Sequence, residues 1–481
     1  TDDQLILLSG GYAVCEREYD GYGNVSVYRY YGKDNQPIII NSGYAEQRRV
    51  FNEKRQVIRD EYYGTDGNRM ALPGGYSALE YEYDSAGNTV VVRYYDEEDR
   101  PVVNSSGYAE IHRVYNDSRQ NIHEEYYGTD GQRIALYEGY AMLEFEYDDD
   151  GNATVIRYLN AEGAPMMIRS GYAEVRRVFN ARKQIIREAY LNTEGQPTLI
   201  GGYASWEREL NEFGGVTFQR YYGLEGEPVM LSGGYCEVRR EYDERGNLLS
   251  ESYYDTEGLP VNTTSAYSRL TRSWTETGEI LEDAYYNADG TPALLGVGYC
   301  RVRYEYNQDR QLMLVYYLDA EDNPVPAGSA NFHAYLRELM EQMRTSEDLV
   351  VFISVKDEAT NSLTVTLRED LKELGLATDF RGRYRNSYYA VITGNETLER
   401  IGYQDVLTLE GTVKDGTAYT ITSAGYQVGN YSSILIGGVE YSTNIRGMNF
   451  VIYDCATHQV KDVVGFDTYA QDMRMVRPAG Y

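Results

Sequence analysis

The sequence predicts a mainly β protein, in which a ten-unit array of 32-residue β-hairpins is followed by an α/β sandwich domain. Two observations predict the array: a tyrosine returns at a fixed interval, and the segments between these tyrosines alternate apolar and polar residues. A third observation predicts the second domain, because the composition changes after Pro326-Ala327-Gly328 and helical spacing then alternates with apolar runs. We assign residues 1–328 to the array and residues 329–481 to the α/β domain.

The composition is that of an acidic, water-soluble chain. Its 481 residues carry a formal charge of −30, which repels nucleic-acid phosphates and anionic lipid, so we expect no nucleic-acid partner. The charge favours either solubility or cation binding by carboxylate turns. No run approaches the roughly 18 apolar residues of a membrane helix. Thr1-Asp2-Asp3-Gln4 lacks a start methionine and a signal-peptide pattern, so we expect any targeting segment to lie upstream.

Ten tyrosines open the repeat units. They lie 32 residues apart, except for one step of 31 residues between Tyr172 and Tyr203, and all but Tyr267 follow a glycine. A weaker 64-residue period overlies the first half of the array, where alternate units read G-Y-A-E-x-x-R-V-[FY]-N. This period indicates that the block duplicated in the sequence is a pair of units. The ten are Tyr12, Tyr44, Tyr76, Tyr108, Tyr140, Tyr172, Tyr203, Tyr235, Tyr267 and Tyr299.

Each unit has the signals of a β-hairpin. Residues 78–83 alternate with period two, Asp84–Asn88 supplies turn residues, and Val90–Tyr94 makes a β-branched return strand. A third extended piece follows and contains a proline in most units, which suits an edge strand. No unit buries a face alone, so the units stack into a rod, either a solenoid or a twisted hairpin ladder. These prolines are Pro37, Pro101, Pro165, Pro197, Pro228, Pro260, Pro292 and Pro324.

The repeat phrases Y-D-x-x-G-N and Y-Y-D-x-x-G-x-P resemble the YD repeats of bacterial surface and toxin proteins. They are also similar, more loosely, to the aromatic hairpin repeats of cell-wall-binding and choline-binding modules. The resemblance covers residues 11–328, although the period of 32 residues is longer than that of either group. It implies a bacterial protein of the cell surface or the extracellular space.

Tyrosine doublets end the second strand of most units. Successive side chains of a strand face opposite sides, so each doublet puts one ring on each face of the sheet. Two interpretations are open: an aromatic ladder that packs neighbouring hairpins together, or a row of sugar-stacking platforms. The resemblance to wall-binding repeats implies the second, with repetition multiplying a weak affinity. The candidate platforms are Tyr95, Tyr127, Tyr222 and Tyr254.

No metal or cofactor site is predicted. The acidic run Asp148-Asp149-Asp150 could bind calcium, but it lacks the EF-hand spacing and the distal glutamate of that motif. Turn chemistry is therefore the favoured interpretation. The four histidines show no ligand spacing, and the four cysteines are too scattered for a disulfide framework or a zinc site. The cysteines are Cys15, Cys236, Cys300 and Cys455.

The α/β domain is predicted from alternating helical and apolar segments. The spacing predicts helices over 332–343 and 363–374, the second ending at Gly375. Short apolar runs predict strands over 349–355 and 388–393. Further expected elements are a turn at Gly437-Gly438 within 431–441 and a strand pair formed by 447–453 and 460–467.

Four segments of this domain resemble the interleukin-like family called ILEI or PANDER, over residues 330–475. They are Val355–Glu358, Arg385–Tyr388, Gly447–Asp454 and Gly465–Tyr469, in an order that implies a circularly permuted domain.

The family also occurs in the stem of the protein O-mannose N-acetylglucosaminyltransferase, where it binds sugar. By this resemblance the sugar-binding residues fall on Asp357 and Arg385, with Tyr388 in place of the usual tryptophan and Asn386 in place of an aspartate. A carboxylate and a guanidinium both hydrogen-bond to sugar hydroxyls. The alternative is a surface Asp–Arg pair that only supports the fold.

No catalytic motif occurs: there is no nucleophile elbow, phosphate-binding loop, H-E-x-x-H or dinucleotide fingerprint. We therefore expect a non-catalytic carbohydrate-binding or adhesion protein of the bacterial surface or envelope, whose partner is a cell-wall or surface glycan. One alternative is an accessory C-terminal region of a larger envelope glycosyltransferase or phosphotransferase. Another is a structural stalk or filament subunit, which self-associates along the array and binds no glycan.

Overall fold

The computed structural model describes residues 6–394 and 396–481. They form two compact units, the first made of residues up to 211 together with 218–232, the second of 212–217 and 233–481. The first unit contains β-hairpins alone, and the second contains hairpins followed by a mixed sheet with two helices. The predicted fold class, a ten-hairpin array followed by an α/β domain, is confirmed.

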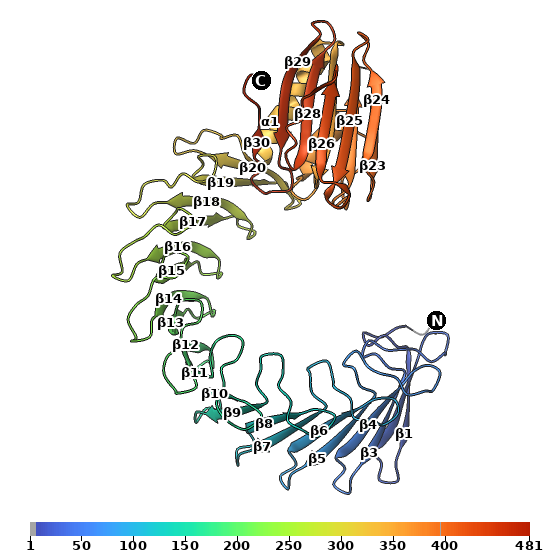
Figure 1. The fold of residues 1–481 in the computed structure, drawn as a ribbon, viewed down its shortest axis with the longest axis vertical. Coiled ribbons are helices and arrows are strands. Elements are labelled where there is room, and N and C mark those ends of the chain that lie inside the picture. Colours follow the sequence, from blue (N-terminus) through green and yellow to red (C-terminus); the bar gives the residue numbers. More distant parts are fainter. Residues whose placement is uncertain (1–5, 395) are drawn as a thin grey trace. The chain divides into compact units, whose positions relative to one another are not determined.

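The ten hairpins contribute twenty antiparallel strands, which lie side by side in chain order within each unit (Figure 1). They are β1 (Val14–Tyr19), β2 (Val25–Tyr31), β3 (Glu46–Phe51), β4 (Val57–Tyr63), β5 (Ala78–Tyr83), β6 (Thr89–Tyr95), β7 (Glu110–Tyr115), β8 (Asn121–Tyr127), β9 (Met142–Tyr147), β10 (Ala153–Leu159), β11 (Glu174–Phe179), β12 (Ile185–Leu191), β13 (Ser205–Leu210), β14 (Val216–Tyr222), β15 (Glu237–Tyr242), β16 (Leu248–Tyr254), β17 (Arg269–Trp274), β18 (Ile280–Tyr286), β19 (Arg301–Tyr306) and β20 (Leu312–Leu318).

One hairpin illustrates how the sequence forms this sheet. In β5–β6, Ala78 pairs with Tyr95, and a β-bulge lies next to Tyr83. The turn is closed by Asp84, whose carboxylate accepts hydrogen bonds from the Asn88 backbone and side-chain nitrogens at 2.9 and 2.8 Å. The return strand β6 then pairs antiparallel with β7 of the next hairpin. The array is therefore a ladder of hairpins rather than a solenoid, which resolves the alternative left open by the sequence.

The proline-containing pieces are shorter than strands. Each proline makes a single antiparallel bridge to the last residue of the preceding strand, as Pro101 does to Tyr95. The next residue, Val102, donates to the Tyr94 carbonyl at 3.0 Å, and the connection then leaves the sheet. Connections of neighbouring hairpins also bond to one another, since the Ser105 nitrogen donates to the Gly74 carbonyl at 2.8 Å. A proline suits this position because the bridge needs no donor from it.

The mixed sheet of the second unit has β21 at its centre. This strand pairs antiparallel with β22 and β28, and its last two residues pair in parallel with β25. The strands are β21 (Leu349–Asp357), β22 (Ser387–Ile392), β23 (Thr397–Gly402), β24 (Leu407–Thr412), β25 (Ala418–Gly425), β26 (Tyr431–Ile436), β27 (Val439–Glu440), β28 (Gly447–Asp454), β29 (Gln459–Phe466) and β30 (Met475–Val476).

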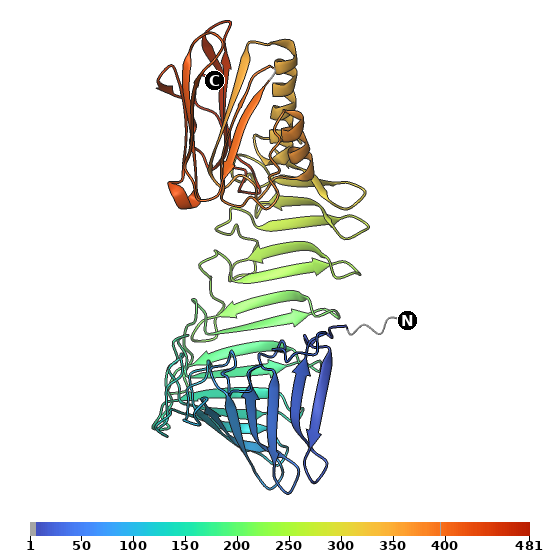
Figure 2. The same ribbon diagram turned by 90° about the vertical axis from the view of Figure 1, so that its right-hand side faces the viewer.

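Two helices, α1 (Gly328–Thr345) and α2 (Val365–Glu373), cover one face of this sheet (Figure 2). Their apolar residues, such as Phe332 and Leu367, share a buried core with β21 and β28. The predicted helix over 363–374 is confirmed but begins at Val365, because the Thr364 side chain caps it by accepting from the Leu367 nitrogen. Among the described residues, no helix is both long and apolar enough to cross a bilayer.

The beginning of α1 lies directly on the last strand of the array. The Ser329 hydroxyl accepts a hydrogen bond from the Val315 nitrogen of β20 at 2.7 Å. Gly328 has a φ of +82°, and a Cβ there would lie within 3.0 Å of the Val315 carbonyl oxygen. Only glycine allows the helix to start this close to the strand. The outer edge of β20 is therefore covered by backbone and side chain of α1.

Candidate carbohydrate-binding residues

The tyrosine doublets divide between the two faces of the hairpin sheet, as the alternation of side chains in a strand requires. The opening tyrosine of each unit and the tyrosine at the next-to-last position of its second strand, usually the first of a doublet, lie on one face, which we call the ladder face. In the first unit successive ring centroids from Tyr12 to Tyr221 are 4.9–6.3 Å apart. In the second unit those from Tyr235 to Tyr317 are 4.7–6.2 Å apart. These are packing distances, so these tyrosines join one hairpin to the next.

The four candidate platforms lie on the opposite face and are half-buried: Tyr95, Tyr127, Tyr222 and Tyr254. Three of their rings have a neighbour over one side. The Arg59 guanidinium lies 5.5 Å from the Tyr95 ring, the Arg239 guanidinium 4.2 Å from that of Tyr254, and the His112 ring 4.6 Å from that of Tyr127. A sugar would stack on these sides of the rings only after displacing the basic side chains.

Carboxylates accept hydrogen bonds from the hydroxyl groups of three of these tyrosines. Tyr95 donates to Glu80 at 2.8 Å, and Tyr222 donates to Glu207. The opposite face is thus a network of tyrosine, arginine and glutamate side chains. The four tyrosines remain predicted sugar contacts, and the structure gives each of them a side-chain partner, either over its ring or at its hydroxyl group.

Glu125, the partner of Tyr127, makes the stability of this network depend on pH. Burial alone would raise its pKa, but hydrogen bonds from Tyr127 and His123 and the charge of Arg133 outweigh burial and lower the pKa from 4.5 to about 2. Because the folded pKa lies below the unfolded value, this carboxylate stabilises the fold above pH 4.5 and loses that contribution as the pH falls toward 2.

We therefore expect Glu125→Gln to lower the urea midpoint at neutral pH, and the difference from the wild type to shrink as the pH falls below 4.5. Glu53→Gln, at an exposed turn position, is the control with the same change of charge and should have little effect at any pH. A deficit for Glu125→Gln that stays constant over this range would contradict the electrostatic explanation.

The segment Asp148–Asp150, for which the sequence favours a turn over a calcium site, is a hairpin turn in the structure. The Asp148 carboxylate accepts from the backbone nitrogens of Asp150 and Asn152 at 3.1 and 2.8 Å. These are the contacts of turn chemistry, the interpretation that the sequence favours. Within the described ranges no group of three or more His, Cys, Asp or Glu residues is arranged to hold a metal ion.

Asp357 and Arg385, predicted from the interleukin-like resemblance, lie together at the carboxyl end of β21. Asp357 is the last residue of that strand, and Arg385 comes two residues before the paired strand β22. The buried Glu358 joins the two segments, because its carboxylate accepts from the Arg385 backbone nitrogen and from the Thr360 nitrogen at 2.5 Å. Asp357 and Arg385 both have positive φ, 65° and 59°, a conformation that the surrounding bonds must maintain.

A second pair of charged residues lies beside the first. Arg446 precedes β28 and Asp467 follows β29, and the guanidinium binds the carboxylate through two bonds of 2.9 and 2.7 Å. Burial raises the pKa of Asp357 above its usual 3.8, and the positive charges of Arg446 and Arg385 offset only part of that effect. The two arginines and two carboxylates therefore act on one another at one end of the sheet.

Aromatic rings complete this group of residues. The Arg385 guanidinium lies 4.0 Å from the ring of Tyr426, which is half exposed, and the Arg446 guanidinium lies 4.4 Å from the ring of Tyr469. The Arg385 Nε is buried and donates to no atom of the described chain. We call Asp357, Arg385, Tyr426, Arg446 and Asp467 the β21-end cluster. It offers hydroxyl acceptors, charged donors and exposed aromatic surface, the contacts that sugars need.

Tyr388 lies elsewhere. Its side chain is 1% exposed, packs against the Phe380 ring at 5.0 Å and donates to Glu399 at 2.6 Å. As placed, it supports the core behind β22 rather than facing a ligand. The position that the resemblance assigns to a tryptophan is therefore buried in this chain.

No family model matches the sequence, and no curated protein matches it either. Solved structures do. A crystal structure of TcdB2-TccC3-TEV covers 96% of this chain at 10% identity, with a TM-score of 0.30. A Photorhabdus luminescens Tc holotoxin pore also covers 96%, at 10% identity and a TM-score of 0.31. This chain spans only 18% of each of those chains. At such scores the likeness supports no conclusion about function, and the interleukin-like family stays a prediction.

Three members of the β21-end cluster could not be assigned from the sequence. Asp467 lies in the Gly465–Tyr469 segment that carries the family resemblance, and Arg446 directly precedes the Gly447–Asp454 segment, so both had a local signal. Tyr426 had none, because it lies in a short 3₁₀ turn after β25 that only the folded sheet brings to Arg385.

Proposed function

We propose that this protein is a non-catalytic carbohydrate-binding protein of the bacterial surface or envelope, in which the β21-end cluster holds the sugar. The observation that carries the proposal is the meeting of Asp357 with two arginines that each lie over a tyrosine ring. Carboxylates accept from sugar hydroxyls, guanidinium groups donate to sugar oxygens, and an exposed ring such as that of Tyr426 packs on the C–H face of a sugar.

The chemistry of the cluster supports binding rather than catalysis. Asp467 is engaged by both bonds of Arg446, and Glu358 is engaged by backbone nitrogens. Carboxylates held in this way are poor proton carriers, whereas they orient hydroxyl groups well. The hairpin array acts as the spacer that presents this domain.

The test is a glycan array probed with the whole chain. Where a glycan binds, we expect Asp357→Asn and Arg385→Lys each to lower affinity by about 10–100-fold, the effect of removing a charged hydrogen bond of about 1.5–3 kcal/mol. The affinity of the wild type should fall with acidification at a pH above 3.8, since the Asp357 pKa is raised.

Glu410→Gln, at an exposed position of β24, makes the same change of charge away from the cluster and should bind normally. If both cluster variants still bind the glycan, the β21-end cluster is not the binding site, although the protein remains a carbohydrate-binding protein. A chain that binds no glycan would overturn the function itself.

A second candidate, a structural stalk, is favoured by the ladder face, where the tyrosines pack on one another. It predicts self-association of the whole chain in sedimentation experiments and no response on the glycan array. The third, an accessory region of a larger envelope glycosyltransferase or phosphotransferase, would keep the sugar site and add a catalytic domain elsewhere in the polypeptide.

A further inference from the structure

The second unit contains a large cleft on the ladder face of its last two hairpins. The cleft has a volume of about 760 Å³, within the range of roughly 300–1,000 Å³ that is usual for small-ligand sites. One side consists of the rings of Tyr285, Tyr304 and Tyr317, and the other of the polar segment Asn361–Thr364 that leads into α2. We call it the tyrosine cleft.

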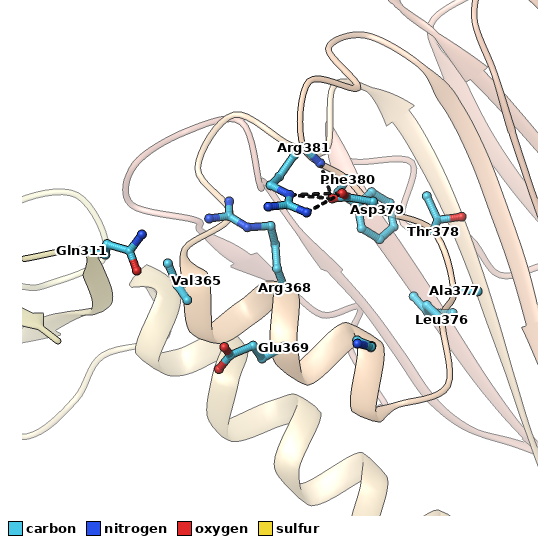
Figure 3. A pocket seen from close by; sticks show the side chains of 11 residues that line it. Gln311, Val365, Arg368, Glu369, Leu376, Ala377, Thr378, Asp379, Phe380 and Arg381 are labelled. Carbon is cyan, nitrogen blue, oxygen red and sulfur yellow. Dashed lines mark hydrogen bonds and ion pairs between the residues drawn. The ribbon is translucent and has the colours of Figure 1, made fainter. Parts of the chain in front are cut away.

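A second hollow of about 560 Å³ continues the tyrosine cleft along α2 (Figure 3). The two share Gln311, Val365 and Arg368, so a ligand can extend from one into the other. Figure 3 shows Arg368 rising from α2 toward the loop that carries Arg381, while Gln311 faces them from the last hairpin turn. We call this part the basic hollow.

The basic hollow concentrates positive charge in a chain whose formal charge is −30. Arg368, Lys372 and Arg381 line it together with only two acidic residues. Arg381 is already paired with Asp379, because its guanidinium donates hydrogen bonds of 2.8–3.1 Å to the Asp379 carboxylate.

Arg368 and Lys372 are different, because among the described residues no carboxylate forms an ion pair with either. Arg368 donates instead to the Leu363 carbonyl. These two cations lie one helical turn apart on α2, on the same side of the helix. The charge of Arg368 acts on the Asp379 carboxylate, but that carboxylate is bound to Arg381 and forms no ion pair with Arg368, so both cations keep donors for an anion.

The tyrosine cleft contains a rigid polar group as well. Asp283, which is 3% exposed, accepts two bonds from Arg272, at 2.6 and 2.8 Å, and both residues line the cleft. Burial raises the pKa of Tyr304 to about 12, so its hydroxyl keeps its proton at neutral pH and remains a donor. Flat rings beside fixed donors and acceptors suit a sugar ring better than an extended peptide, which needs a row of backbone partners.

We propose that the tyrosine cleft and the basic hollow together bind an acidic oligosaccharide, with a sugar ring on Tyr304 and the anionic group on Arg368 and Lys372. The anionic group is a carboxylate, a sulfate ester or a phosphate ester. This inference rests on the proposed function in one respect, that the ligand is a carbohydrate, and it assigns a different site from the β21-end cluster.

The experiment is calorimetric titration of the whole chain with four probes: a galacturonate tetrasaccharide, its neutral methyl ester, a sulfated tetrasaccharide and a mannose-6-phosphate oligosaccharide. We expect at least one acidic probe to bind ten-fold or more tightly than the neutral ester, with an affinity that falls as salt is added. The strongest acidic probe identifies the anionic group. Equal binding of acidic and neutral probes would overturn the inference.

Arg368→Gln combined with Lys372→Gln should remove this preference, whereas Lys33→Gln combined with Lys54→Gln, which loses the same charge at exposed turns, should retain it. Tyr304→Leu gives a second measure and should weaken all the probes that bind. If Asp357→Asn abolishes binding while the α2 pair has no effect, the inference fails and the proposed function stands. If no saccharide binds in any titration or array, both fail.

Discussion

Replacing Tyr126 by alanine is expected to destabilise the first unit by about 3–5 kcal/mol, the usual cost of removing a buried aromatic ring. Tyr126 is 6% exposed, and its ring centroid lies 5.1 Å from that of Tyr108 and 5.9 Å from that of Tyr140. Its hydroxyl donates to Glu124, which also accepts from Arg113 at 2.9 Å. The substitution leaves a cavity between two hairpins and a half-buried carboxylate short of a donor.

Hydrogen exchange is the suitable measurement, because in a repeat array each unit is stabilised chiefly by its neighbours. Protection should fall most in β7, β8 and β9 and less with distance along the array. Tyr126→Phe keeps the ring and should cost only about 1 kcal/mol. Tyr22→Ala, at a residue 76% exposed, is the control and should leave protection unchanged. Loss of protection spread evenly over the whole first unit would show that the ladder is not a nearest-neighbour structure.

Gly447→Ala is expected to cost the second unit roughly 3–5 kcal/mol, by adding backbone strain to a steric clash. Gly447 has a φ of +101°, and a Cβ there would lie within 3.0 Å of the Phe466 carbonyl oxygen and the Thr468 nitrogen. Both are backbone atoms, so neither can turn away. The strands β28 and β29 must separate at this point, and the adjacent Arg446 then moves away from Asp467.

Urea denaturation of the two variants Gly447→Ala and Gly416→Ala separates the two causes. Gly416 also has a positive φ, +87°, but a Cβ there would meet no atom within 4 Å. Its substitution should therefore cost only the conformational term of about 1–2 kcal/mol. Equal losses for both variants would mean that the close approach of β28 and β29 contributes nothing.

The hairpin array could be predicted because its information is local. The period-two alternation at residues 78–83 and the turn Asp84–Asn88 define one hairpin without reference to any other, and the 32-residue repeat then extends the result. The ladder arrangement could not be predicted, since the antiparallel pairing of β6 with β7 depends on the path of the connection between them.

In the α/β domain, apolar runs identified β21 and β28, whose residues are buried on both faces. Strands β23, β24 and β25 were not predicted. Thr, Glu and Gly residues are frequent in them, and β23 and β24 are largely half-buried or exposed, so they lack the apolar run that marks a central strand. They form because β23 pairs with β22, β25 with the end of β21, and β24 in turn with β25, which is a tertiary effect.

For the candidate site, the sequence supplied Asp357 and Arg385 through a family resemblance and left Arg446, Asp467 and Tyr426 unassigned. Arg446 comes 89 residues after Asp357 in the sequence. That these two residues lie at the same end of the sheet could be predicted only from the pairing of β21 with β28, which the sequence does not reveal. The basic hollow was equally hidden: Arg368 looks like an ordinary surface residue of an amphipathic helix until the last hairpin turn faces it.

The close contact of α1 with β20 has a consequence for the behaviour of this protein at high concentration. An open strand edge is a template on which another chain can add its own strand, and long hairpin sheets are exposed to that form of aggregation. Here the Val315 nitrogen is already bound by Ser329, and Gly328 covers the neighbouring carbonyl. The first turn of α1 thus blocks the edge of β20 and prevents a strand of another chain from pairing with it.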